Sequence, residues 1–461
     1  MPAGVEFSLA SSEDVMACSA LPREESPAAG QTGKRRAVLI GNFTPRVCGI
    51  ATFTRDLLGG LSGANDAVQW DVVAMNDREP GFYAFGPEVR HVIQQETAAD
   101  YLRTADAINR SNAEAVFVQH EFGIFGGPAG EHVLLLLRRI RAPVIVTLHT
   151  VLASPNDDQR RVLEEIIGLS AAVVVMAATG ARLLAEVYNA PSDRIRVIPH
   201  GAPTRPRLPT ASFKKRLGLE RRQTLLTFGL LSPNKGIETI IRAMPEILRR
   251  APDALYLVAG ATQPNLVRER GEEYREGLMR LAAELGVEQS IQFIDKYLSD
   301  EELVDLLQAS DVYVTPYLTE AQITSGTLSY AIALGRPIVS TPYWHASEAL
   351  ADGVGVLCPF GDTSCFARTI GDLLVDDARR ADLAQRAWRY GLSSRWPNVG
   401  AAYLRLAGLL SGSLMETGSR RGSRLWGQGH AAINSWDRRT VRAWRWRHMA
   451  QITSLGALGA E

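Results

Sequence analysis

The strongest constraint on the fold is an alternation of short apolar runs and helical stretches that stops at a proline-rich segment and then restarts. Runs rich in β-branched residues between helical segments are typical of parallel strands buried on both faces. The first series is RRAVLIG, a helix over 50–61, WDVVAM, AEAVFVQ, APVIVTLH, AAVVVMA and RIRVIP; the second is TLLTFGL, ALYLVAG, IQFID, DVYVTP, RPIVST and GVGVLCP. The sequence therefore predicts an α/β fold of two tandem, doubly wound Rossmann-like domains that face a ligand cleft.

Domain limits follow from the breaks in this pattern. The segment APTRPRLPT, after Gly201, disfavours regular structure and is expected to link the domains. Helices of the second series are expected at 236–249 (kinked at Pro245), 274–285, 300–308 and 329–334, and 378–410 is expected to be helical with a break at Trp396 and Pro397. The predicted parts are a disordered leader over 1–34, an N-terminal domain over 35–204, a C-terminal domain over 205–395, a helix over 396–410 and a tail over 411–461.

Composition excludes several classes of protein. Lysine plus arginine equals aspartate plus glutamate, at 50 each in 461 residues, so no overall field attracts nucleic acid or a membrane. The four cysteines lack CxxC spacing, which argues against structural zinc and fits a reducing compartment, with the cytoplasm as the expected location. There is no secretory signal, and no run approaches the roughly 18 apolar residues that a membrane span needs.

The tail over 411–461 differs from the rest of the chain. It holds four of the eight tryptophans and a series of arginines. Peripheral contact with a membrane surface or with nucleic acid is one interpretation. A poorly ordered extension, or a helix packed on the body, is the alternative.

A first phosphate-binding turn is expected after the run TLLTFGL. The turn contains Ser232, Pro233, Asn234, Lys235 and Gly236, and a helix begins directly after it. Free amides and one lysine then face the carboxyl end of a strand, which suits an anion. A solvated lysine at the start of a helix is the alternative interpretation.

A second phosphate-binding turn is expected between DVYVTP and the following helix, at Thr324, Ser325, Gly326 and Thr327. Its amides and hydroxyls can converge on a phosphate, or can cap the helix, and both uses are compatible. In the loop before this turn, Tyr317, Glu320 and Gln322 are candidate contacts for the group that carries the phosphate. A polar loop rim is the alternative.

Polar residues that face the predicted cleft are expected at strand ends of the first domain. His149 ends APVIVTLH, where an imidazole could accept or orient the proton of a bound hydroxyl group. His120 and Glu121 directly follow AEAVFVQ, in VFVQHEFGIFGG, and are expected to shape the same pocket, without a third ligand for a metal. Gly49 is expected to let a loop approach a ligand closely, with a simple turn glycine as the alternative.

From about Ala37 to Leu410 the chain resembles the retaining family 4 glycosyltransferases of GT-B architecture. The resemblance is carried by the turn at Gly49 and Ile50, by IPHG, by FGLLSPNKG and by AIALGRPIVST. It implies that the helix over 396–410 returns to the first domain. It also implies an acceptor-side role for His149 and a metal-independent reaction without a cofactor, in which the nucleotide-diphosphate sugar is a co-substrate.

Two positions depart from the family pattern. Leu230 stands where the family usually has arginine, with Arg268 and Arg270 as replacement candidates. The usual pair of glutamates falls on Gln322 and Tyr330, and Glu320 replaces the first only with a shift of two residues. The second glutamate normally holds the ribose hydroxyls, so Tyr330 is expected at the donor site.

The sequence therefore predicts a retaining hexosyltransferase that moves sugar from a nucleotide-diphosphate sugar to a carbohydrate or other hydroxyl acceptor. His149, Lys235 and Glu320 are the expected catalytic residues. Contacts with the donor sugar are expected from Tyr317, Glu320 and Gln322, and contacts with the acceptor from His120, Glu121 and His149. Two alternatives stay open: a phosphorylase or epimerase of the same architecture, and a non-catalytic sugar-nucleotide-binding protein. A dehydrogenase is disfavoured because Gly41 is not followed by GxGxxG.

Overall fold

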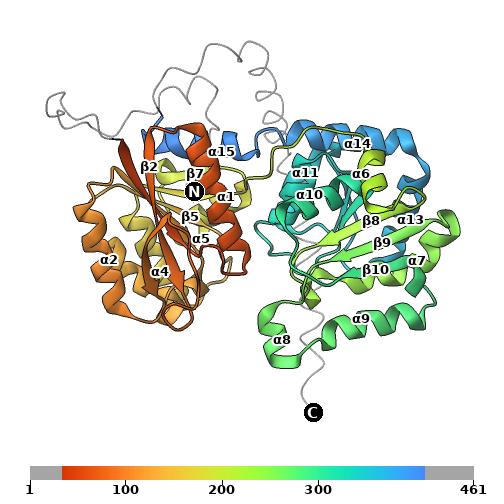
Figure 1. Ribbon diagram of the computed structural model, residues 1–461, viewed down its shortest axis with the longest axis horizontal. Coiled ribbons are helices and arrows are strands. Elements are labelled where there is room, and N and C mark those ends of the chain that lie inside the picture. The colour runs from red at the N-terminus through yellow and green to blue at the C-terminus, as the bar shows by residue number, and fades with distance from the viewer. Residues whose placement is uncertain (1–33, 411–461) are drawn as a thin grey trace, which may run out of the picture. The chain divides into compact units, whose positions relative to one another are not determined.

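The computed structural model describes residues 34–410, and the predicted leader and the tail over 411–461 lie outside these residues. Two parallel sheets organise this part of the chain (Figure 1). The first sheet has seven strands in the order β3-β2-β1-β4-β5-β6-β7. Its strands are β1 (Arg35–Gly41), β2 (Val68–Asn76), β3 (Val89–Gln94), β4 (Ala115–His120), β5 (Val144–Leu148), β6 (Ala172–Val175) and β7 (Ile195–Val197).

The strands of the first sheet are apolar because helices pack against the sheet. Val38, Val73, Val116, Val146 and Val173 belong to one buried cluster formed between the sheet and its helices. Strands buried on both faces need an apolar residue at nearly every position. The helices are α1 (Gly49–Ala64), α2 (Ala98–Arg110), α3 (His132–Leu137), α4 (Asp157–Leu169) and α5 (Ala178–Tyr188).

The second sheet has six strands in the order β10-β9-β8-β11-β12-β13, and all its pairs are parallel. Its strands are β8 (Gln223–Phe228), β9 (Ala254–Ala259), β10 (Ile291–Ile294), β11 (Val312–Thr315), β12 (Ile338–Ser340) and β13 (Val356–Leu357). Its helices are α6 (Thr210–Leu217), α7 (Ile237–Arg250), α8 (Pro264–Arg270), α9 (Glu273–Glu284), α10 (Asp300–Ala309), α11 (Gly326–Ala333), α12 (Trp344–Ala349), α13 (Thr363–Val375) and α14 (Asp377–Tyr390). The predicted fold class of two doubly wound α/β sheets is confirmed.

Each sheet reverses its winding at one point. In the first sheet the reversal lies between β1 and β4, and in the second it lies between β8 and β11. At such a point the loops leave neighbouring strands in opposite directions and open a crevice at their carboxyl ends. The turn with Lys235 follows β8, and the loop with Tyr317 and Ser325 follows β11, so both open at the reversal of the second sheet.

The last helix of the described chain, α15 (Trp396–Leu406), packs against α1 of the first sheet. A Cβ built on Gly400 would lie 2.2 Å from the carbonyl oxygen of Gly60, and one on Gly60 would lie 2.6 Å from that of Trp396. Both positions therefore need glycine, because the two helix backbones touch there. The chain thus crosses between the sheets twice, and the crossings pair with each other: Ala202 N–H donates to Ser394 O at 2.7 Å.

Several expected local features were wrong. Edge strand β3 was missed, because its middle is exposed and polar and lacks the apolar run of the inner strands. Pro245 lies inside helix α7, and the kink expected there stays a prediction. The expected break at Trp396 and Pro397 lies earlier, over 391–395, since proline is tolerated in a first helical turn. Helix α11 begins at Gly326, three residues before the predicted start.

Candidate functional site

A lysine and three hydroxyl groups converge at the reversal of the second sheet. Lys235 Nζ donates a hydrogen bond to the phenol oxygen of Tyr317 at 2.6 Å and lies 4.3 Å from the centre of the same ring. The Tyr317 oxygen is in turn 2.9 Å from Thr327 Oγ1, which is 3.1 Å from Ser325 Oγ. The ammonium is therefore held inside the crevice, next to the start of α11.

The start of α11 offers backbone donors beside this lysine. Ser325 is the N-cap, and its Oγ accepts from Leu328 N–H at 3.3 Å. Gly326 and Thr327 are the first two helical residues, and amides at these positions have no acceptor within the helix. The helix dipole adds partial positive charge at the same place. An anion at this point would meet Lys235, two amides and the Thr327 hydroxyl.

Two histidines fix the backbone of this turn. Ser325 N–H donates to Nδ1 of His345 at 2.9 Å, so this amide is already occupied. A Cβ on Gly326 would lie 2.9 Å from Nε2 of His200, which makes glycine necessary there. Burial, followed by the nearby His200, lowers the pKa of His345 to about 3, and burial lowers that of His200 to about 4. Both rings are neutral at physiological pH, and neutral His345 can accept the Ser325 hydrogen bond.

The lysine also changes the acidity of its tyrosine partner. Burial by itself would raise the pKa of the Tyr317 phenol, but the Lys235 ammonium and the hydroxyls of Thr327 and Ser325 outweigh burial, so this pKa is lowered. The phenol stacks on Tyr343, with ring centres 5.0 Å apart. Tyr317 therefore orients Lys235 and polarises the hydroxyl chain that leads to α11.

His149 supplies a neutral imidazole at the carboxyl end of β5. Its Nε2 lies 3.1 Å from Oε1 of Gln119. With the amide oxygen facing the ring, Nε2 carries the proton and Nδ1 remains as an acceptor. Burial lowers the pKa of His149 to about 3, with smaller contributions from His200 and His120. Phe53 of α1 packs edge-on against His149, with centroids 4.8 Å apart.

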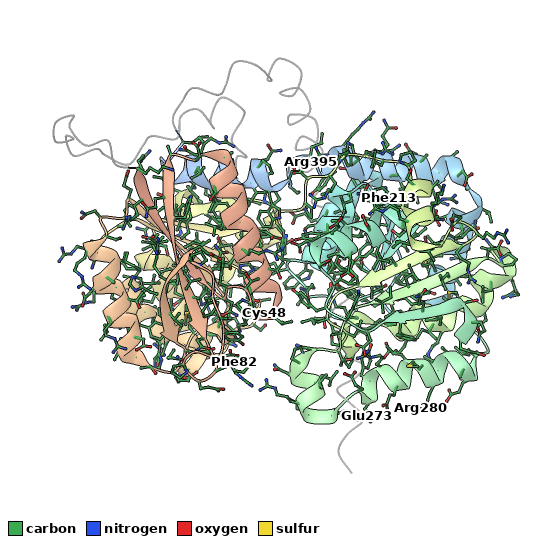
Figure 2. All side chains as sticks on the ribbon, viewed as in Figure 1. Cys48, Phe82, Phe213, Glu273, Arg280 and Arg395 are labelled. Atoms are coloured by element: carbon green, nitrogen blue, oxygen red, sulfur yellow. The ribbon has the colours of Figure 1, made fainter. Side chains whose placement is uncertain are left out.

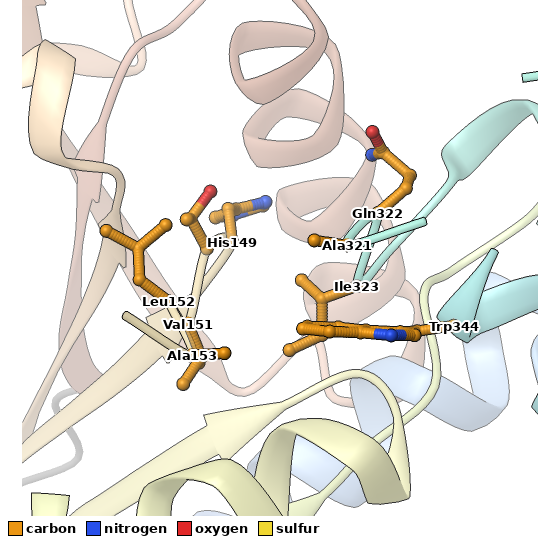
Figure 3. Close-up of a pocket in the computed structure, with 9 residues that line it drawn as sticks. His149, Val151, Leu152, Ala153, Ala321, Gln322, Ile323 and Trp344 are labelled. Carbon is orange, nitrogen blue, oxygen red and sulfur yellow. The ribbon is translucent and has the colours of Figure 1, made fainter. Parts of the chain in front are cut away.

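A small cavity joins residues from both sheets (Figure 3). It has a volume of about 110 Å³. A drug-sized ligand site usually encloses roughly 300–1,000 Å³, so this cavity admits a few waters and no nucleotide sugar. Its lining comprises His149, Thr150, Val151, Leu152, Ala153, Ala321, Gln322, Ile323 and Trp344. The predicted residues His149 and Gln322 therefore line one cavity together with the indole of Trp344.

The other acceptor-side candidates lie in different surroundings. Glu121 accepts from Phe122 N–H at 3.0 Å and from the Thr150 hydroxyl, so it contacts a cavity-lining residue. His120 is fully buried and stacks on Phe125, with centroids 5.8 Å apart. It is not among the residues that line the cavity. The acceptor-binding roles of both residues stay predictions.

The remaining donor-side candidates are dispersed. Glu320 is exposed, and its carbonyl accepts from Trp344 N–H at 3.0 Å. The Thr324 carbonyl accepts from Gln322 Nε2 at 2.5 Å. Arg268 and Arg270 are exposed at the end of α8, and no contact joins them to Lys235 within residues 34–410. The role of Arg268 or Arg270 as a replacement for the arginine missing at Leu230 stays a prediction.

Gly49 has open space around it, so its close approach to a ligand stays a prediction. A Cβ on Gly49 would meet nothing within 4 Å, so no protein atom requires glycine there. The residue opens α1, whose N-cap is Cys48, shown at the end of this helix in Figure 2. Cys48 Sγ accepts from Ala51 N–H at 3.3 Å. The turn is held by this thiol cap.

Tyr330 makes a contact that the sequence did not suggest. Its phenol donates to Oδ2 of Asp56 in α1 at 2.9 Å, and Asp56 is also bound by Arg55 at 2.6 Å. Burial raises the pKa of the Asp56 carboxyl, and the Arg55 charge and hydrogen bonds only partly oppose this rise. Arg55 further binds Asp300 at the start of α10, at 2.6 Å. These groups form a polar junction between α1 and the second sheet.

Sequence reasoning missed several residues of this region. His345 and Trp344 open α12, Asp56 lies in α1, and Glu348 accepts from Ala178 N–H at 2.7 Å at the start of α5. The only local signal was the polar run YWHASE after the strand RPIVST, which breaks an otherwise apolar region. The partners of these residues are distant in the sequence, so no spacing rule could have paired them.

No metal centre is evident in the part of the chain that the structure describes. Within residues 34–410, no three His, Cys, Asp or Glu side chains gather as a metal ion requires. None of the helices over the same range combines the length and hydropathy of a membrane span. The metal-independent reaction and the cytoplasmic location stay predictions.

Two doubly wound sheets with their reversal points at loops that carry polar site residues define a two-domain α/β protein of GT-B architecture. Comparison with protein families matches "Glycosyl transferases group 1" over residues 210–389 and "Glycosyltransferase Family 4" over residues 47–205. The first match covers the lysine turn and α11, and the second covers β4 and β5. The chain belongs to glycosyltransferase family 4.

Curated relatives agree with this family. The chain is 30% identical over 285 residues to the D-inositol 3-phosphate glycosyltransferase of Nocardia farcinica, a match that covers 58% of this chain and 61% of that protein. It is 30% identical over 257 residues to the GDP-mannose-dependent alpha-(1-6)-phosphatidylinositol monomannoside mannosyltransferase of Mycolicibacterium smegmatis, which covers 53% and 64% of the two chains. The chain therefore spans about three-fifths of the length of these relatives.

Solved structures share the fold at low identity. Sucrose-phosphate synthase from Thermosynechococcus elongatus superposes with a TM-score of 0.67 and 18% identity, over 82% of this chain and 99% of that one. The Anabaena protein HepE in complex with UDP and glucose superposes with a TM-score of 0.62 and 15% identity, over 81% and 99%. These likenesses establish the GT-B architecture of the two sheets.

Proposed function

We propose that this protein transfers a glycosyl unit from a nucleotide-diphosphate sugar to a hydroxyl acceptor, with retention of the anomeric configuration. The observation that carries the proposal is the convergence of Lys235, Tyr317 and the start of α11 at the reversal of the second sheet. Membership of family 4 supports the same reaction class.

The anion site suits the leaving group of this reaction. Negative charge develops on the diphosphate as the bond to the sugar breaks, and preorganised donors stabilise that charge without rearranging. Lys235 supplies a full positive charge, and the amides of Gly326 and Thr327 supply oriented dipoles. Tyr317 restrains the lysine before the donor binds, which reduces the entropy lost on binding.

The acceptor is proposed to enter beside His149. Its Nδ1 can accept the hydrogen bond of a hydroxyl group, because Nε2 faces Gln119. Glu121 restrains Thr150 in the same loop. Trp344 and Ile323 supply apolar walls in the same cavity (Figure 3), which would exclude water that otherwise hydrolyses the donor.

A non-catalytic sugar-nucleotide-binding protein is the second candidate. One observation favours it: the hydroxyl of Tyr330, where the family has a ribose-binding glutamate, is already engaged by Asp56. Leu230 also removes a cationic group at the family's arginine position. If this candidate is right, the protein binds the diphosphate of a sugar nucleotide at Lys235 but does not transfer the sugar.

The test uses the full chain with radiolabelled UDP-glucose and GDP-mannose, each with and without a pool of polyol, inositol phosphate and oligosaccharide acceptors. Transfer of label to an acceptor in one of these combinations, with the anomeric configuration retained by NMR, is the expected result. Binding by calorimetry without any transfer would favour the second candidate. Donor conversion without acceptor would favour an epimerase, and phosphate-dependent formation of sugar phosphate would favour a phosphorylase.

A further inference from the structure

Two cysteines of the second sheet face each other at the end of β13. Cys358 directly follows β13, and Cys365 is the third residue of α13. Their Sγ atoms are 2.7 Å apart, which is closer than the roughly 3.5–4.0 Å optimum for non-bonded heavy atoms. Both are free thiols. The pair is therefore in position for a bond between the two sulfur atoms.

The backbone holds both cysteines in this arrangement. Cys358 N–H donates to the Ser340 carbonyl at 2.8 Å and so continues the pairing of β13 with β12. Cys365 N–H donates to Oδ1 of Asp362, the N-cap of α13, at 2.8 Å. Thr369 Oγ1 lies 3.6 Å from Cys358 Sγ and 3.9 Å from Cys365 Sγ. The contact thus belongs to two anchored segments.

The two thiols differ in their access to solvent. Cys358 is only 1% exposed and belongs to the buried cluster with Val339 and Phe366. Cys365 is partly exposed. We propose that Cys358 and Cys365 are a reversible redox pair, oxidised by low-molecular-weight disulfides such as oxidised glutathione, in which Cys365 reacts first and Cys358 resolves. This site is independent of the proposed transferase function.

The reaction proceeds in two exchanges. The Cys365 thiolate attacks one sulfur of the small disulfide, forms a mixed disulfide and releases one small thiolate. Cys358 then gives its proton to solvent and attacks Cys365 Sγ, which forms the protein disulfide and releases the second small thiolate. Two electrons pass from the protein to the small disulfide, which becomes two thiols. Excess small thiol reverses both steps.

The burial of Cys358 fits its role as the second thiol. Burial, together with the hydrogen bond to Cys365, raises the pKa of the Cys358 thiol to about 12. A thiol that keeps its proton is a poor nucleophile, so Cys358 is not expected to react first with a small disulfide. The mixed disulfide on Cys365 places a sulfur with a leaving group at the required position.

The proposal is tested with the full-length Cys18→Ser/Cys48→Ser variant, in which only this pair remains. The variant is equilibrated in buffers of oxidised and reduced glutathione, quenched with acid, and digested with a protease that cuts before aspartate. Cleavage before Asp352, Asp362 and Asp372 separates the two cysteines. We expect two peptides joined by a disulfide, a mass lower by two hydrogens, no glutathione adduct, and full reversal by dithiothreitol.

Single replacements test the order of reaction. In the same background, Cys358→Ser is expected to retain one glutathione on Cys365, whereas Cys365→Ser is expected to leave Cys358 unmodified over the same time. Equal labelling of the two variants would overturn the assigned order. A persistent glutathione adduct on the protein with both cysteines, or two thiols still titratable after unfolding, would overturn the pair itself.

Thermal unfolding gives a readout that does not depend on peptide mapping. A disulfide here closes a short loop and ties the end of β13 to α13, so the oxidised variant is expected to unfold roughly 5 °C above the reduced one. The double variant lacking both Cys358 and Cys365 should show no such difference between oxidising and reducing buffers. An unchanged unfolding temperature in a sample whose pair is fully oxidised would overturn the expected tie between β13 and α13.

Discussion

The phenol of Tyr330 donates a hydrogen bond to Oδ2 of Asp56, 2.9 Å away, and so ties helix α11 of the second sheet to helix α1 of the first. The Asp56 carboxylate is partly buried and keeps only Arg55 as a charged partner when the phenol is removed. A buried acceptor that loses one of its donors retains most of its desolvation cost.

We therefore expect Tyr330→Phe to lower the free energy of unfolding by about 1–2 kcal/mol. Chemical denaturation of this variant, of Asp56→Asn and of the double variant forms a mutant cycle. A coupling of about 0.5–3 kcal/mol is expected for residues in contact. Additive effects of the two single changes would show that the hydrogen bond contributes nothing to stability.

Lys235→Ala should weaken the binding of UDP or GDP by about 1–3 kcal/mol, the usual value of a hydrogen bond to a charged group. The Lys235 ammonium is expected to contact only the diphosphate, so the binding of a nucleoside without phosphate should change little in this variant. Isothermal calorimetry with both nucleotides and their nucleosides measures this difference. Lys215→Ala, at an exposed position of α6, is the matched control. Equal diphosphate affinity in wild type and Lys235→Ala would reject the assigned anion site.

Two glycine-to-alanine replacements should differ in their effect on stability: one should destabilise the protein and the other should change little. A Cβ on Gly326 would collide with the His200 ring at 2.9 Å, whereas one on Gly49 meets open space. Gly326→Ala is expected to cost about 1–3 kcal/mol of stability by overpacking, and to weaken diphosphate binding as α11 shifts. Gly49→Ala should stay within about 0.5 kcal/mol of wild type. Thermal melts and nucleotide titrations of the two variants compare them directly.

His120 should make the protein sensitive to acid. Burial lowers its pKa from 6.5 to about 3, so between these values the unfolded chain binds a proton that the folded chain does not. The contribution of neutral His120 to the free energy of unfolding is therefore fully present above pH 6.5. As the pH drops below 6.5, this free energy decreases by about 1.4 kcal/mol per pH unit for this group.

His120→Leu should make the dependence of unfolding free energy on pH less steep by about this amount between pH 6 and 4. Urea titrations across that range supply the slope. His91→Leu, at an exposed position of β3, is the control and should leave the slope unchanged. If both variants keep the wild-type slope, His120 does not remain neutral in the folded protein.

The parts of the fold that depend on local sequence could be predicted. Inner strands need continuous apolar runs, and their order along the chain predicted both sheets. The turn at Lys235 could be located because it follows β8 directly. Edge strand β3 could not, because its exposed residues, His91 among them, resemble a loop.

The contacts of the site could not be predicted from the sequence. Lys235 and Tyr317 are separated by 82 positions, and Tyr330 and Asp56 by 274. Such pairs depend on how the sheets wind and on how loops pack, neither of which leaves a pattern in neighbouring residues. Ser325 was expected near a phosphate, but the acceptor of its amide, His345, lies in another helix.

The paired crossings near Ala202 and Ser394 limit how the two sheets can separate. Trp396 N–H also donates to the Ala202 carbonyl at 3.1 Å, so the two backbone segments are bonded side by side. The link between the two sheets is therefore a pair of bonded segments and not two independent single chains.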